Sequence, residues 1–235
     1  MTLSFEERRL ILRLQEVSLM VDAAAGVERL HIHIDVLSGD LILMRFERGL
    51  QGTVFADTCI GLIPPLAGDV YFLGRNWNGL HSDLANALRG RIGRVFRSGN
   101  WIDYLSVQEN IMLPQAYHTR RRIKNLRAEA ALLARHLGLP GLPTSAPEAL
   151  NRSDLQSAAC VRAFLGQPSL VILEDPTVGA DPAMLPKLIN LICDCRSQGA
   201  AVVWLTLEDS IWQDPTLPVN RRFRASGQEI NEVTR

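Results

Sequence analysis

The chain has 235 residues, of which 47% are hydrophobic and 21% are charged. This length and composition provide for one large α/β domain, or a domain with an inserted lobe, and exclude a mainly disordered chain. Lys and Arg number 25, as do Asp and Glu, so the zero net charge gives no support to a nucleic-acid-binding function. No apolar run of 18 residues is present that could span a membrane.

Taken in chain order, apolar runs and turn residues predict an α/β chain. Strands are expected at residues 11–21, 27–36, 41–44, 70–73, 92–96, 170–173 and 200–205, with a strand pair between 221 and 230. A small-residue turn at 23–26 is expected to join the first two strands. Helices are expected at 55–62, 81–89, 110–117, in a segment ending near 137, between 150 and 167, and at 182–196.

The ends and the cysteines add two expectations. The first ten residues, MTLSFEERRL, lack the apolar segment of a signal peptide. The four cysteines are scattered without the spacing of zinc ligands, so reduced thiols typical of the cytosol are expected.

The most informative stretch is residues 170–182, LVILEDPTVGADP. Four apolar residues are followed by two carboxylates, Glu174 and Asp175, and then by a turn-forming sequence. Such a run predicts a buried parallel strand that carries its acids to the carboxyl edge of the sheet. Because open α/β sheets bind ligands at that edge, a ligand site is expected there.

This stretch resembles the Walker B strand and D-loop of ATP-binding cassette (ABC) transporter ATPases, with the family's Asp-Glu pair exchanged to Glu-Asp. The turns at 39–40, 64–65, 68–69 and 74–75 also fall in the family's register. The resemblance implies an α/β fold, a P-loop NTPase-like ABC ATPase core with an antiparallel β subdomain and an inserted α-helical lobe. It implies one domain over residues 1–235, with the core at 10–97 and 155–230 and the helical lobe at 98–154.

The register places a phosphate-binding loop at residues 46–54. Such a loop needs glycines that let backbone N–H groups surround phosphates, a Lys for the β- and γ-phosphates, and Ser or Thr for Mg²⁺. Gly49 and Thr53 are retained, but Phe46 and Gln51 replace glycines and Gly52 replaces the Lys. Two glycines ahead of a helix still leave weak anion binding open.

Other positions to which the resemblance assigns chemistry also differ. Arg97 replaces a Gln that contacts Mg²⁺ and the attacking water, and Leu207 replaces the catalytic His. Val21 replaces the aromatic that stacks on adenine, and residues 151–154 read NRSD in place of the signature, where Ser153 or Asp154 is predicted to cap a helix. The positional equivalents of nucleotide-binding residues are Gly49, Gly52, Thr53, Arg97 and Asp181.

Residues 98–113 are similar to the segment by which the family's helical lobe grips a membrane permease. Trp101 and Tyr104 are candidate permease contacts, because exposed aromatic side chains supply contact area; the alternative is that both pack inside the lobe. Residues 96–99 and 176–182 look most similar to ATPases of the Mce/Mla-type phospholipid-trafficking transporters. The resemblance implies a cytoplasmic location, peripheral on the inner face of the cell membrane.

Three functions are open. The first, which we favour, is a degenerate ABC subunit with a structural or regulatory role, which binds ATP and Mg²⁺ poorly or not at all and pairs with itself or with an intact ABC ATPase beside a membrane permease. The second is a working ATPase with an unorthodox site, in which Glu174 and Asp175 are the candidate catalytic residues and Thr53 and Glu174 would hold Mg²⁺. The third is a soluble binding module that reuses the fold without a transporter.

Overall fold

The structure is a computed structural model that describes residues 8–23 and 26–233. The strands in these ranges form one sheet in the order β5-β4-β1-β2-β10-β9-β3-β8-β7-β6. Parallel pairing joins β9 (Arg221–Ser226), β3 (Leu41–Arg45), β8 (Ala201–Thr206), β7 (Leu170–Glu174) and β6 (Ile92–Val95). The rest is mostly antiparallel: β5 (Arg75–Asn76), β4 (Ala67–Phe72), β1 (Leu10–Ala23), β2 (Gly26–Leu37) and β10 (Glu229–Glu232). The turn predicted at 23–26 includes residues 24 and 25, which lie outside the described residues.

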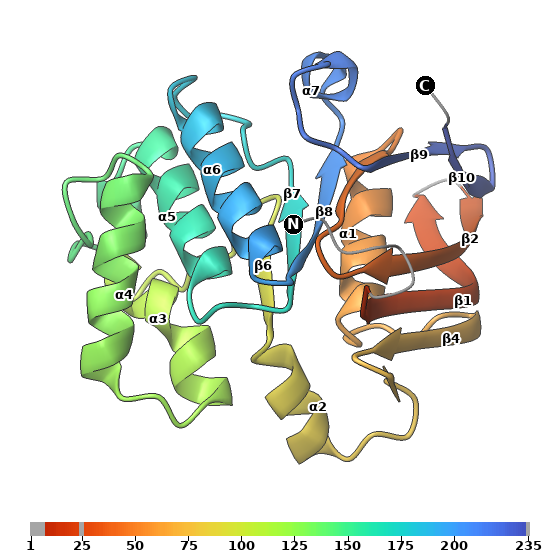
Figure 1. Cartoon of the computed structure of the whole chain (residues 1–235), viewed down its shortest axis with the longest axis horizontal. Coiled ribbons are helices and arrows are strands. Elements are labelled where there is room, and N and C mark those ends of the chain that lie inside the picture. Colours follow the sequence, from red (N-terminus) through yellow and green to blue (C-terminus); the bar gives the residue numbers. More distant parts are fainter. Residues whose placement is uncertain (1–7, 24–25, 234–235) are drawn as a thin grey trace.

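Helices cover both faces of the sheet (Figure 1). One helix, α1 (Gly49–Cys59), packs on β1 between the parallel strands and the antiparallel ones. The other face carries α3 (Val107–His118), α4 (Ile123–His136), α5 (Arg152–Phe164) and α6 (Met184–Ser197). Shorter elements are α2 (Ser82–Arg89), α7 (Asp209–Gln213) and a 3-10 turn at Pro147–Ala149.

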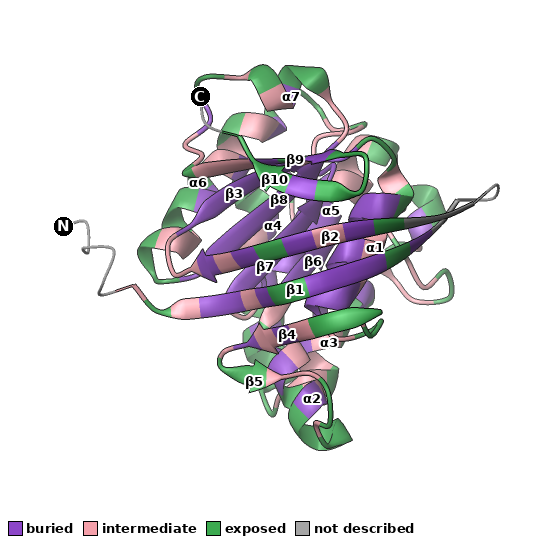
Figure 2. Cartoon of the chain, turned by 90° about the vertical axis from the view of Figure 1, so that its right-hand side faces the viewer, coloured by how far each residue is buried: buried purple, intermediate pink, exposed green. Residues whose placement is uncertain are grey.

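The parallel strands divide their side chains between two hydrophobic cores, as the two-residue period of a strand requires. On β3, Ile42 and Met44 join the core around α1, whereas Leu41 and Leu43 join the core under α5 and α6. The strands are therefore buried along most of their length (Figure 2). The sheet fixes the carboxyl ends of β3, β7 and β8 beside one another, and the candidate site is built there.

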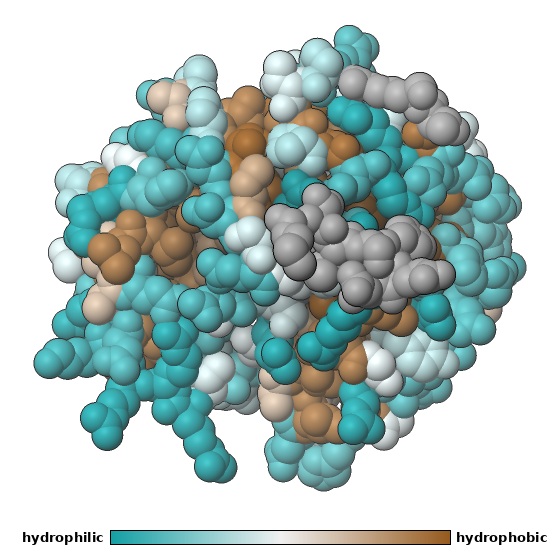
Figure 3. Space-filling view, viewed as in Figure 1, coloured by the Kyte–Doolittle hydropathy of each residue, from teal (hydrophilic) through white to brown (hydrophobic). Residues whose placement is uncertain are grey.

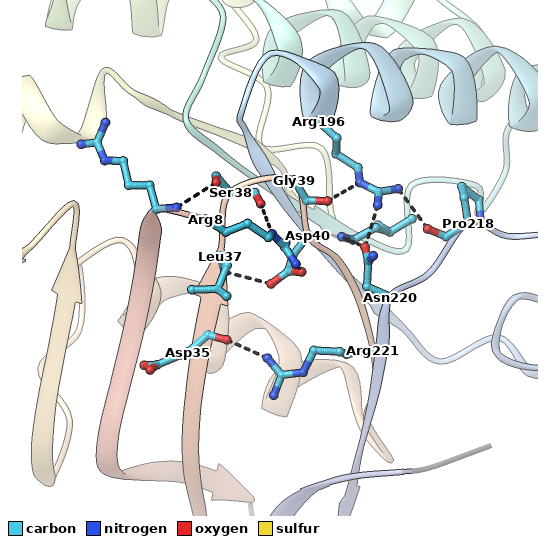
Figure 4. Close-up of polar contacts among 12 residues, drawn as sticks. Arg8, Asp35, Leu37, Ser38, Gly39, Asp40, Arg196, Pro218, Asn220 and Arg221 are labelled. Atoms are coloured by element: carbon cyan, nitrogen blue, oxygen red, sulfur yellow. Dashed lines mark hydrogen bonds and ion pairs between the residues drawn. The ribbon is translucent and has the colours of Figure 1, made fainter. Parts of the chain in front are cut away.

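A polar cluster lies near the amino end of β3, at the end of the strand away from the candidate site (Figure 4). Asp40, 1% exposed, pairs with Arg8 at 2.5 Å and accepts the backbone N–H of Leu37 at 2.8 Å. Arg196, at the end of α6, donates to the carbonyl of Gly39 and to Asn220. These contacts join the start of β1, the β2–β3 turn, α6 and β9.

The start of α1 and the N-cap of α5 differ from the sequence prediction. Helix α1 begins at Gly49, six residues before the predicted start at residue 55, because its first turn lacks the apolar periodicity from which the prediction was made. The predicted caps Ser153 and Asp154 are wrong: the cap of α5 is Asn151, whose side chain accepts the N–H of Asp154 at 2.8 Å.

The surface agrees with the balanced charge of the sequence. Hydrophilic side chains cover much of the face in Figure 3, and hydrophobic side chains form separate patches between them. Among the described helices, none combines the length and the apolar character needed to cross a bilayer.

Candidate functional site

The site lies where the carboxyl ends of β3, β7 and β8 meet the N-terminus of α1. Strand register places Glu174 beside Leu205 and Arg45 beside Thr206, so the ends of the three strands are level. Phe46 follows β3 directly and leads into α1. Residues 46–54 and 174–175, more than 100 positions apart in the chain, therefore lie together at this edge.

Two backbone N–H groups of the loop before α1 are bonded within the loop. The side-chain oxygen of Gln51 accepts the N–H groups of Glu47 at 3.1 Å and of Arg48 at 3.0 Å. Gln51 is 2% exposed, so this carbonyl is a fixed part of the loop. It occupies the acceptor position that an anion would take at such a loop, and these two N–H groups already have a partner.

Side chains also fill the space above the loop. Phe46 is 2% exposed, contacts Phe55 with ring centroids 5.8 Å apart, and lies against Gly52. The guanidinium of Arg97 covers Gly49 so closely that a Cβ atom there would lie 0.8 Å from an Arg97 nitrogen. The cavity left at this point has a volume of about 10 Å³, which is close to the minimum for one water molecule.

Glu174 is buried in a polar network and does not face the cavity freely. It is 3% exposed, and its Oε2 accepts the hydroxyl of Thr53 at 2.7 Å. Its Oε1 pairs with Nε of Arg94 at 2.8 Å, and the same guanidinium pairs with Asp57 of α1 at 2.5 Å. Both oxygens of the candidate catalytic acid therefore have partners within the chain.

Sequence reasoning missed Arg94 and Asp57. The signal available was a charged residue inside the apolar strand IGRV, which is unusual because a buried charge requires a partner. The partners themselves could not be found from the sequence, since Asp57 and Glu174 lie 37 and 80 positions from Arg94.

Asp175 has a different environment from its neighbour. Its backbone is in the left-handed region, with φ of 45°, and its Oδ1 accepts the N–H of Leu207 at 2.9 Å. Leu207 thus contributes a backbone donor, while its side chain packs against the core around α1. The pair holds the ends of β7 and β8 together.

The remaining predicted residues lie around this edge. Asp181 accepts the N–H of Ala183 at 2.8 Å, and its own N–H donates to the hydroxyl of Ser153 at 2.8 Å. Arg152 lies against Gly179, so the NRSD segment contacts the segment after β7. Within the described residues, no group of three or more His, Cys, Asp or Glu side chains is arranged to hold a metal ion.

The two candidate contact aromatics differ in burial. Tyr104 is 88% exposed. Trp101 packs against the core under α5, with the guanidinium of Arg162 stacked 4.5 Å from its ring centroid. Burial lowers the pKa of Arg162 to about 10, so Arg162 keeps its charge at neutral pH and binds the carbonyls of Gly99 and Asn100. Tyr104 alone of the two has a freely accessible ring.

Comparisons with known proteins identify the fold. No protein-family model matches the chain. The glutamate/aspartate import ATP-binding protein GltL of Escherichia coli strain K12 is 26% identical over 74% of the chain and 72% of its own length. The intermembrane phospholipid transport system ATP-binding protein MlaF of the same strain is 26% identical over 71% of the chain and 62% of its own length. A dimeric bacterial ABC transporter cassette superposes with a TM-score of 0.83 at 20% identity, over 95% of the chain and 98% of the cassette. The chain is thus similar to ATP-binding subunits of ABC transporters, and its fold is that of an ABC cassette.

The predicted fold class is thereby confirmed. The ligands to be tested against this site are ATP and Mg²⁺, which the sequence resemblance implies. The residues of this chain do not fit them in the observed arrangement. The cavity beside Phe46, Gly49 and Arg97 has a volume of about 10 Å³, and Gln51 accepts two backbone N–H groups of the loop. Glu174 is bound to Arg94 and Thr53.

Proposed function

We propose that this ABC chain is a non-hydrolysing nucleotide-binding-domain subunit of a transporter, with a structural or regulatory role. The observation that carries the proposal is how Phe46 and Gln51, each 2% exposed, are placed in the loop. Phe46 fills space that a triphosphate needs, and the side-chain oxygen of Gln51 accepts a backbone N–H group that a phosphate would need. Because both are part of the core or of the loop's own hydrogen bonding, emptying the site requires repacking and not only a side-chain rotation.

The magnitude of the losses supports the same proposal. A hydrogen bond to a charged group contributes roughly 1.5–3 kcal/mol, so loss of the Lys and several loop contacts costs about 6 kcal/mol, on the order of 10⁴ in affinity. Hydrolysis loses more, because Asp175 is one methylene shorter than the family's Glu and a misplacement of about 1 Å costs about 10²-fold.

The partners in this proposal are a membrane permease and a second cassette, which is either the same chain or an intact ABC ATPase. Tyr104, 88% exposed, is the proposed permease contact, while Trp101 supports the loop that carries it. The proposed location is the cytoplasmic face of the membrane. We assign phospholipid as the cargo class from residues 96–99 and 176–182 and the similarity to MlaF. The first alternative, an unorthodox ATPase, requires an open phosphate site. The second, a partner-free module, requires a helical lobe whose surface binds no permease.

The test is thermal unfolding of the isolated chain with millimolar Mg-ATP, for which no shift is expected. A ligand present at 100 times its dissociation constant stabilises a protein by about 2.7 kcal/mol, which would raise the melting temperature of a chain of this size by roughly 5–10 °C. Such a rise would contradict the proposal. Gly52→Lys alone is expected to leave hydrolysis absent, because Leu207 and the NRSD segment remain. Restored turnover would be a second contradiction.

A further inference from the structure

The polar network around Glu174 has the composition of a divalent-cation site. Two carboxylates, from Glu174 and Asp57, and the hydroxyl of Thr53 converge from β7 and α1. Oxygen donors of this kind suit Mg²⁺ or Mn²⁺, which take carboxylate and hydroxyl ligands. The position between the two carboxylates is held by the guanidinium of Arg94.

Strand register aims Arg94 at this position. Arg94 pairs with Ile172 across β6 and β7, and Glu174 follows Ile172 by two residues. Side chains two residues apart share one face of a sheet, so Arg94 and Glu174 both point toward α1, which carries Asp57 and Thr53. The forked guanidinium can meet two carboxylates at once, whereas a Lys ammonium at this place would lack that geometry.

Burial keeps the guanidinium of Arg94 paired with its two carboxylates in the folded chain. Arg94 is 6% exposed, and its guanidinium also lies over the ring of Phe96, 4.4 Å from the centroid. A buried charge without a partner is strongly unfavourable, so separating Arg94 from Glu174 would cost free energy for both side chains. A divalent ion entering the site would have to displace a cation of the chain itself and would leave that cation buried.

We propose that Arg94 is a built-in cation that takes the divalent-ion position beside Glu174, so the carboxylates of this ABC chain are neutralised without a metal. This inference rests on the proposed function in one respect, since both place Glu174 outside Mg-nucleotide chemistry. It goes further by predicting which single side chain excludes the ion.

The experiment is a Mn²⁺ titration without nucleotide, followed by the electron paramagnetic resonance signal of free Mn²⁺. The wild-type chain is expected to bind no stoichiometric Mn²⁺. Arg94→Met is expected to bind one Mn²⁺ per chain with a dissociation constant on the order of 10⁻⁴–10⁻³ M, in the range of weak carboxylate sites. The added change Glu174→Gln is expected to abolish that binding. The matched control is Arg91→Met, an exposed arginine next to the same strand, which is expected to behave as wild type.

Binding of one Mn²⁺ by the wild-type chain, or a folded Arg94→Met chain that binds none, would overturn the inference. If Arg94→Met does not fold, Arg94→Gln is titrated in its place, and a folded Arg94→Gln chain that binds no Mn²⁺ overturns the inference. Failure of the proposed function is a separate result. Mg-ATP turnover by a chain that binds no Mn²⁺ alone would refute the non-hydrolysing role and leave Arg94 as assigned.

Discussion

Replacement of Glu174 by Gln tests whether this acid holds the fold together. The substitution keeps the size of the side chain and an acceptor for one neighbour, but it removes the charge that faces Arg94 at 2.8 Å. Breaking a buried ion pair costs roughly 3–5 kcal/mol. Because Asp57 remains 2.5 Å from the same guanidinium, we expect the lower end, about 3 kcal/mol. For a chain of this size that loss corresponds to a fall in melting temperature of roughly 6–12 °C.

The assay is urea unfolding followed by tryptophan fluorescence, with the midpoint expected to fall at an unchanged denaturant slope. The matched control is the neighbouring Asp175→Asn. Asn tolerates the left-handed backbone at this position and its amide oxygen can still accept the N–H of Leu207, so a loss below about 1 kcal/mol is expected. A Glu174→Gln loss below about 1 kcal/mol, or equal losses for both variants, would refute the reasoning.

Three further predictions concern other parts of the chain. Asp40→Ala should lower the free energy of unfolding by about 3 kcal/mol, because Arg8 loses its buried partner; a loss below about 1 kcal/mol in urea would contradict this. Burial, and then the charge of Arg89, lower the pKa of His118, so the unfolded chain binds this proton more readily and stability should fall as the pH drops below about 6.5. His118→Asn should flatten that acid slope, and an unchanged slope would count against it. Tyr104→Ala should weaken co-purification with the permease while leaving the melting temperature unchanged; equal recovery would remove Tyr104 from the interface.

Much of the fold could be predicted from the sequence because it depends on local pattern. The strands at 41–44, 92–96 and 170–173 are short apolar runs between turn residues, and the structure has strands there. The start of α3 was missed by three residues: the helix begins at Val107, after a capping box formed by Ser106 and Glu109 that the prediction did not use. Helix α1 was harder, since its first turn contains glycines and no apolar stripe.

The position of the candidate site could be predicted from the sequence, but the side-chain contacts within it could not. The register with the ABC family placed residues 46–54 beside Glu174, because the family fixes which loop follows which strand. What fills the loop depends on side chains that meet across elements. The oxygen of Gln51 bonds back to the loop, and Arg94 reaches Asp57 on α1. Such contacts follow from three-dimensional packing, which neither spacing nor periodicity encodes.

The central proposal is that this chain keeps the architecture of an ABC cassette while its own side chains occupy the position of a triphosphate. The most direct measurement is equilibrium binding of radiolabelled ATP with Mg²⁺ to the purified chain, with an intact ABC ATPase as positive control. We predict no saturable binding up to about 1 mM ATP, in line with an affinity lowered by roughly 10⁴. Saturable binding of one ATP per chain at micromolar concentration, displaced by unlabelled ATP, would contradict the claim.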